Sequence, residues 1–185
     1  MRAIDRLLQR WRMRRAMAWL PPRVRLIDIG AHEGELFHAL GARLVEGFGI
    51  EPLRPQPIQT QTYQIVPGFF PAARPANGGW DGITMLAVLE HVPAAEQPSL
   101  AAACHDLLRP GGRVIVTVPA PAVDVILVAL KLLRLIDGMS LEEHYGFKPS
   151  DVPRIFVSPL FRLVAHRRFQ LGLNHLYVFE RSAKE

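Results

Sequence analysis

The stretch Leu26-Ile27-Asp28-Ile29-Gly30-Ala31-His32-Glu33-Gly34-Glu35-Leu36 decides how this chain folds. The apolar run over residues 24–29 predicts a buried strand, which delivers Asp28 and Gly30 into a tight turn. A helix is expected to begin at Gly34, because the apolar residues that follow recur at helical spacing. A strand, turn and helix joined in this way bring backbone amides close to a ligand, so the stretch predicts a ligand site at the turn.

The residues of this turn argue against a dinucleotide. A dinucleotide-binding turn needs glycine at positions 30, 32 and 35, but the last two are His32 and Glu35. Glu33 and Glu35 also place two negative charges at the start of the helix, where they would repel a pyrophosphate. A cationic or zwitterionic ligand is not repelled, so NAD is disfavoured.

The rest of the chain alternates short β-branched runs with helical stretches, which is typical of a parallel α/β sheet. We expect a Rossmann-like, doubly wound, mostly parallel sheet of seven strands with an antiparallel C-terminal hairpin. The predicted strands are 24–29, 45–50, 64–66, 82–86, 113–118, 161–168 and 174–180. The predicted helices are 4–19, 34–42, 94–108 and 123–136, with a later one starting at Ser150 or Asp151.

Three features interrupt this regular pattern. Pro52, Pro55 and Pro57 leave little room for a normal helix, so an irregular link is expected there. The sequence Pro110-Gly111-Gly112 predicts a turn, and residues 67–79 are expected to form a loop.

Composition fits one globular domain over residues 1–185. The 185 residues are 49% hydrophobic and 21% charged, which excludes a disordered or collagen-like chain. The single cysteine, Cys104, permits no internal disulfide and indicates a reducing compartment, so we expect a cytoplasmic protein. Cys104 lies among alanines within a predicted helix and is expected in the core rather than as a nucleophile. No targeting or membrane-spanning segment is predicted.

Positive charge is concentrated in a basic helical arm, residues 1–22. Residues 1–25 carry eight arginines and one acid, a local charge of +7, whereas the other 160 residues carry 14 basic and 16 acidic side chains. A nucleic-acid-binding domain usually spreads its basic residues over the folded surface, so nucleic acid is an unlikely partner. The arm is interpreted first as a solvated face, with contact to an anionic membrane surface as the alternative.

Four motifs in order over residues 24–119 resemble class I S-adenosylmethionine (SAM)-dependent methyltransferases. Asp28, Gly30 and Gly34 match the family's first motif, Asp-x-Gly-x-Gly-x-Gly, although its middle glycine is His32 here. Glu51 follows at the end of the second predicted strand. The stretch 80–93, WDGITMLAVLEHVP, looks like the fourth-strand signature of the UbiG- and UbiE-like, type 11/23 methyltransferases. Residues 108–113, LRPGGR, are similar to the family's turn before the fifth strand.

The resemblance implies a cofactor site for SAM, which becomes S-adenosylhomocysteine (SAH) after transfer. It assigns the cofactor to Asp28, Gly30, His32 and Gly34 at the turn, and Leu86 along the cofactor. Glu51 would accept hydrogen bonds from both ribose hydroxyls. The acid that often follows the third strand is missing, and Phe69 or Phe70 is expected either to pack on the adenine ring or to fill the loop. The basic arm is expected over the cofactor cleft, with Trp11 and Trp19.

Methyl transfer to an O or N atom of a small-molecule acceptor is the leading hypothesis. It needs in-line alignment, exclusion of water and, for some acceptors, a base. His91 is the first candidate for a base, and Glu143, His144 and Tyr145 are candidates from a predicted acceptor-side lid, residues 122–150. Two alternatives stay open: a SAM- or SAH-binding protein without catalytic activity, and an RNA methyltransferase that uses the arginine-rich arm. No metal site is predicted, because His32-Glu33 is not followed by a histidine at position 36.

Overall fold

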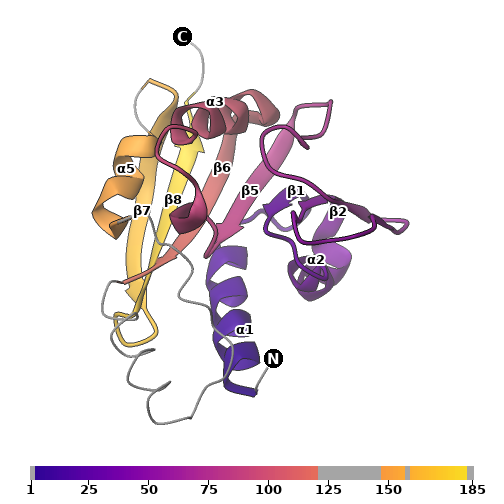
Figure 1. The fold of residues 1–185 in the computed structure, drawn as a ribbon, viewed down its shortest axis with the longest axis horizontal. Helices are drawn as coiled ribbons and strands as arrows, with labels where there is room; N and C mark the ends of the chain where they lie inside the picture. The colour runs from indigo at the N-terminus through magenta and orange to yellow at the C-terminus, as the bar shows by residue number, and fades with distance from the viewer. Residues whose placement is uncertain (1–2, 121–146, 157–158, 183–185) are drawn as a thin grey trace.

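A computed structural model of the chain describes residues 3–120, 147–156 and 159–182, with side chains described from residue 6 onward. The described strands form one eight-stranded sheet in the order β3-β4-β2-β1-β5-β6-β8-β7 (Figure 1). Their bounds are β1 Val24–Ile29, β2 Leu44–Ile50, β3 Ile58–Gln59, β4 Tyr63–Val66, β5 Trp80–Leu86, β6 Leu108–Pro119, β7 Phe161–Phe169 and β8 Asn174–Arg181.

The sheet is parallel at its centre and antiparallel at its edges. Strands β4, β2, β1, β5 and β6 run parallel to one another. β8 is antiparallel to both β6 and β7, which gives the predicted C-terminal hairpin. The fold class is therefore confirmed: a Rossmann-like, mostly parallel sheet. In such a sheet the carboxyl ends of the parallel strands meet at one edge, where ligands bind.

Helices cover both faces of the sheet. They are α1 Ala3–Met17, α2 Glu35–Leu40, α3 Gln97–Leu107 and α5 Val152–Ile155, with 3-10 turns η1 Gly41–Arg43, η2 Leu89–His91 and η3 Pro149–Asp151. Buried side chains of α1 and α2 share one apolar cluster with Leu26 and Ile115, on one face. Those of α3 and α5 share a second cluster with Ile27 and Val116, on the other face. Neighbouring strand residues point to opposite faces, so both faces of the central strands are buried.

The structure corrects the expected strand count from seven to eight. The additional strand, β3, is two residues long and pairs antiparallel with β4 through Ile58 and Gln59. It follows the proline-rich link after β2, where an irregular segment was expected. Pro57 favours extended backbone at Gln56, the residue before it, just ahead of this strand.

Three further boundaries differ from the prediction because of local backbone geometry. β6 begins at Leu108 rather than at residue 113, because buried Leu108 already pairs with Trp80 of β5. The predicted Pro110–Gly112 turn is an irregularity in the β5–β6 register, and Gly111 has φ 75° there. Helix α2 ends at Leu40, because Gly41 leaves helical geometry with φ 53° and ψ −127°. Helix α3 begins three residues later than predicted, at Gln97, with Pro98 in its first turn.

Part of the prediction lies outside the described residues. The expected helix 123–136, most of the predicted lid 122–150, and Glu143, His144 and Tyr145 belong to this part. The described end of that region contains η3 and then α5, which places a helix start at Asp151 as expected. No helix among the described residues is long and apolar enough to span a membrane.

Candidate active site

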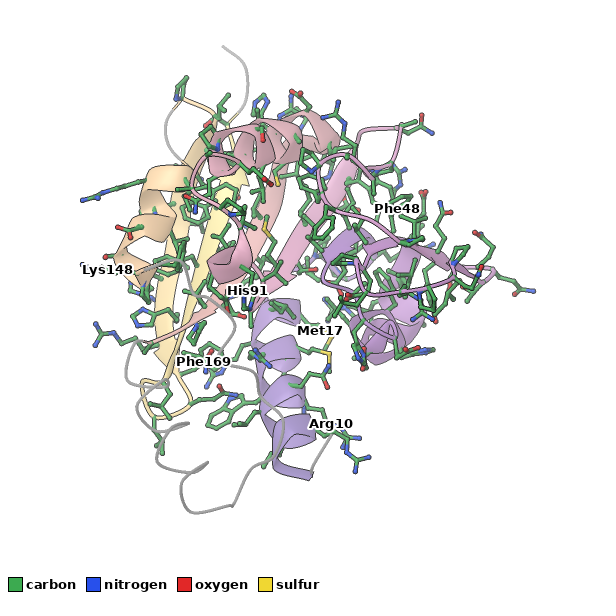
Figure 2. All side chains as sticks on the ribbon, in the orientation of Figure 1. Arg10, Met17, Phe48, His91, Lys148 and Phe169 are labelled. Atoms are coloured by element: carbon green, nitrogen blue, oxygen red, sulfur yellow. The ribbon has the colours of Figure 1, made fainter. Side chains whose placement is uncertain are left out.

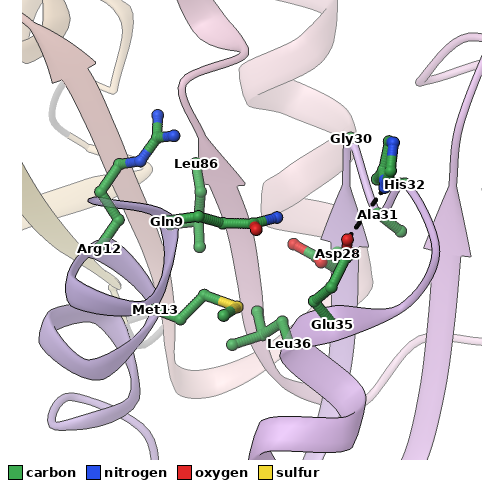
Figure 3. Close-up of a pocket in the computed structure, with 10 residues that line it drawn as sticks. All are labelled: Gln9, Arg12, Met13, Asp28, Gly30, Ala31, His32, Glu35, Leu36 and Leu86. Carbon is green, nitrogen blue, oxygen red and sulfur yellow. Dashed lines mark hydrogen bonds and ion pairs between the residues drawn. The ribbon is translucent and has the colours of Figure 1, made fainter. Parts of the chain in front are cut away.

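A pocket lies at the carboxyl ends of β1 and β5, beneath α1. The side chains that line it come from α1, from the turn after β1, from α2 and from β5 (Figure 3). They are Gln9, Arg12, Met13, Asp28, Gly30, Ala31, His32, Glu35, Leu36 and Leu86. The N-terminal arm therefore lines this pocket, but Trp11 and Trp19, which were expected to cover the cleft with it, are not among the lining residues. The enclosed space is about 70 Å³, well below the 300–1,000 Å³ of typical ligand pockets, because side chains of α1 reach into it.

Asp28 is a buried carboxyl at the floor of this pocket. It is 5% exposed, and the Thr84 hydroxyl donates a 2.6 Å hydrogen bond to its Oδ1. The pKa of Asp28 is raised from 3.8 to about 7, chiefly by burial and also by the nearby negative charges of Glu35 and Glu51, while the hydrogen bond from Thr84 acts in the opposite direction. A positively charged ligand group in the pocket would relieve both effects, so the site favours a cation.

Gly30 lets β5 and the turn after β1 approach each other closely. It has φ 81°, and a Cβ at this position would lie 2.5 Å from Cγ2 of Val88. The backbone amides of Gly30 and Ala31 both donate to the Ile50 carbonyl, which ties the turn to β2. On the β5 side, Ala87 has φ 64° and donates its amide to Thr117 of β6. Non-glycine residues with positive φ are uncommon and gather at functional sites.

His32 adopts the backbone conformation for which the family uses glycine. Its φ is 46°, within the left-handed region, which histidine occupies more readily than most residues. Its amide donates to Glu51 Oε2 at 3.0 Å, and its Nδ1 lies 3.0 Å from Glu35 Oε1. Arg54 donates to the His32 carbonyl at 3.0 Å and pairs with Glu33. The turn is therefore closed by hydrogen bonds even though His32 stands where the family motif has glycine.

Glu51 and Glu35 are fixed in place on either side of this turn. Glu51 follows β2, and its Oε1 accepts from the Leu53 amide at 3.2 Å while Oε2 accepts from His32. Each carboxylate oxygen has further acceptor capacity, as ribose hydroxyls require. Burial opposes ionisation of Glu35, but hydrogen bonds from its own backbone, from His32 and from Glu33 outweigh this and lower its pKa. The pocket therefore carries fixed negative charge.

The other predicted cofactor residues are placed differently. Leu86 lines the pocket at the end of β5. Gly34 is buried behind the turn, where a Cβ would meet Ile65 and Tyr63 at 3.2–3.3 Å, so its lack of a side chain serves packing. Phe70 fills the loop core, whereas Phe69 is 74% exposed. His91 ends η2, directly after the loop that follows β5, and is exposed. The roles of these residues toward a cofactor stay predictions.

Three pocket residues of α1 were not predicted individually: Gln9, Arg12 and Met13. They recur at helical spacing with buried Ala16 and Leu20, which was the available sequence signal. Burial lowers the pKa of Arg12, while the charge of Glu90 raises it. A basic side chain therefore closes a pocket whose floor is acidic.

The expectation for Cys104 is met. Cys104 is fully buried in the core, and burial raises the pKa of its thiol far above the usual range, as expected for a core residue. Among the described residues, no group of three or more His, Cys, Asp or Glu side chains is arranged to hold a metal ion.

The sequence matches the model of the methyltransferase domain family over residues 2–156, so the chain belongs to this family. It is a class I SAM-dependent methyltransferase, an enzyme whose cofactor is SAM. No curated protein matches the sequence.

Solved structures share the fold at low sequence identity. A putative methyltransferase in complex with the Haloferax volcanii Trm112 activator has a TM-score of 0.71 at 14% identity, covering 99% of this chain and 95% of that one. Magnesium protoporphyrin IX methyltransferase from Synechocystis PCC 6803, with bound SAH, has a TM-score of 0.66 at 18% identity, covering 98% and 89%. The Burkholderia thailandensis 1,6-didemethyltoxoflavin-N1-methyltransferase has a TM-score of 0.65 at 16% identity, covering 93% of this chain and 79% of that one.

Proposed function

We propose that this protein transfers the methyl group of SAM to an O or N atom of a small-molecule acceptor. The single observation that carries the proposal is the pocket in which Asp28 and Glu35 face one space while Glu51 is held by the amide of the same turn. The donor set fits SAM, because carboxylates suit its sulfonium and ammonium charges and its ribose hydroxyls. Side chains of α1 must move aside to admit the whole cofactor, since they fill much of the pocket.

Each residue has a separate proposed task. Asp28 and Glu35 attract the positive part of the cofactor, Glu51 accepts from the ribose, and Leu86 supplies apolar contact. Phe69 is proposed to cover the adenine ring. When bound, SAM supplies an activated methyl group, whose bond to sulfur breaks as the acceptor lone pair forms the new bond. The protein then has to align the acceptor and exclude water, and α1 is proposed to provide part of that cover.

A base is required where the acceptor loses a proton on methylation. His91 is our first candidate because η2 positions it directly after the loop that follows β5, which ends at Leu86. His144 and Tyr145, with Glu143, remain candidates from the predicted lid. The proposed acceptor is a small molecule and the proposed compartment is the cytoplasm. Magnesium protoporphyrin IX and 1,6-didemethyltoxoflavin, named for two fold relatives, support the class of acceptor only.

A SAM- or SAH-binding protein without turnover is the second candidate, favoured by the missing acid after β4 and by the confined pocket. Incubation with methyl-labelled SAM and a panel of hydroxyl- and amine-bearing metabolites separates the two. We expect label in an acceptor with the parent protein and much less, at a SAM concentration that is limiting for the parent, with the Glu51→Ala variant. Tight SAH binding with no labelled product across the panel would favour the second candidate.

A further inference from the structure

An exposed apolar patch is formed by two segments that are far apart in the sequence. Leu7, Leu8 and Trp11 lie on α1, and Leu171 lies at the tip of the β7–β8 hairpin. The exposed fractions are 64% for Leu7 and 97% for Leu171. We call these four residues the α1–hairpin patch.

Direct contacts hold the two halves of the patch together. Gln170, next to Leu171, donates a 2.9 Å hydrogen bond to the Leu8 carbonyl. The Trp11 ring meets Phe169 edge-on, with 6.5 Å between ring centroids. Gln170 and Leu171 both have positive φ, 51° and 58°, so the hairpin takes an uncommon backbone form that leaves the Leu171 side chain in solvent. The patch is therefore a fixed surface rather than scattered apolar residues.

Basic residues border the patch in the two segments that carry it. Residues 6–17 contain five arginines and residues 166–175 contain two, with no acidic residue in either segment. Arg6, Arg10 and Arg14 follow one another at spacing of four along α1 and are exposed, so they form a basic stripe. Figure 2 shows Arg10 on one side of α1 and Phe169 on the other. Leu7 lies three residues before Arg10, so the basic stripe borders the apolar residues at Leu7.

We propose that the α1–hairpin patch docks on an anionic lipid bilayer. Apolar and aromatic side chains flanked by arginines match the boundary between lipid headgroups and acyl chains, where the apolar groups insert and the cations meet phosphate. RNA fits less well: arginines and Trp11 serve phosphate contact and stacking, but Leu7, Leu8 and Leu171 contribute nothing to either. The exposed leucines therefore favour an anionic bilayer over RNA as the partner.

The placement of the patch relates it to the pocket. α1 uses Gln9, Arg12 and Met13 to cover the pocket, and Leu7 and Trp11 lie elsewhere on the helix surface, in solvent. A helix with its side chains is about 10–12 Å across, so docking would hold the pocket about that far from the bilayer. Docking does not depend on methyl transfer, and it is tested without cofactor.

The test is co-sedimentation of the full chain with vesicles of phosphatidylcholine, with and without about one-third phosphatidylglycerol. Two patch variants are used: Arg10→Glu/Arg14→Glu and Leu7→Gln/Leu171→Gln. Matched controls carry the same changes at exposed positions outside the patch, Arg74→Glu and Leu53→Gln. All six side chains are exposed, so the variants are expected to fold, and circular dichroism checks this.

The parent is expected to bind the anionic vesicles and not the neutral ones. The arginine variant should lose at least 25-fold in partitioning, since each basic residue near such a surface contributes about fivefold, or about 1 kcal/mol. The leucine variant should lose about tenfold or more, and both controls should bind like the parent. Trp11 emission should shift to the blue on binding, and Trp11→Phe should remove that shift.

Three results would overturn the proposal. They are absence of binding to the anionic vesicles, equal loss in the control variants, and binding that falls with the arginine changes but not with the leucine changes. The last result, together with equally tight binding of a single-stranded RNA, would identify the arm as a nucleic-acid contact instead.

Discussion

Replacing Asp28 with asparagine tests whether a carboxyl is held at the pocket floor against its preference to ionise in water. Its pKa is raised from 3.8 to about 7, first by burial. Between these values the folded state holds a proton that the unfolded state has released, so stability is present at low pH and is lost as pH rises toward 7. The Asp28→Asn side chain stays neutral and still accepts from Thr84. Relative to this variant, the free energy of unfolding of the parent should fall by about 2–3 kcal/mol between pH 5 and pH 8.

Urea unfolding followed by circular dichroism at the two pH values measures this difference. Glu96→Gln is the control, because Glu96 is exposed and this variant should give the same pH dependence as the parent. An Asp28→Asn variant whose stability changes with pH in parallel with the parent would refute the reasoning, since the buried carboxyl would then carry no penalty.

Three further predictions concern the cofactor. SAM affinity of the parent, measured by calorimetry, should rise as pH increases through about 7, since the cation favours ionised Asp28. In Asp28→Asn the affinity should not change with pH, and the same pH profile in both proteins would count against this role of Asp28. Glu51→Ala should weaken SAH binding at least tenfold while the circular dichroism spectrum stays that of the folded parent, and unchanged affinity would remove its role. Gly30→Val should lower the free energy of unfolding by about 1–3 kcal/mol, because its Cβ would lie 2.5 Å from Val88; a parent-like urea midpoint would contradict that.

The turn after β1 was predictable because its chemistry is local. An apolar run, an acid and two glycines specify a strand, a ligand-facing carboxyl and positive backbone angles, and the structure has Asp28, Gly30 and Gly34 at these places. His32 shows the limit of this reasoning. Its identity departs from the motif, and only the structure shows that hydrogen bonds to Glu51 and Glu35 stabilise its left-handed conformation.

Features that depend on distant contacts were harder to predict. The cover of the pocket by α1 was expected, but the particular residues, Gln9 and Arg12, follow from how the helix docks on the sheet. The two-residue strand β3 has too little sequence for a periodic pattern, and it exists because β4 offers it a partner. Likewise, Leu171 gains its neighbours on α1 only through the fold, by the contact of Gln170 with Leu8.

Thermal unfolding of the purified protein with and without SAH tests the central claim most directly. SAH at about 100 times its dissociation constant stabilises the folded state by about 2.7 kcal/mol, and in a chain of this length that raises the melting temperature by about 5–10 °C. The account predicts this rise for the parent and a much smaller one for Glu51→Ala. No rise in the parent at millimolar SAH would contradict the assignment of the pocket beneath α1 as a cofactor site.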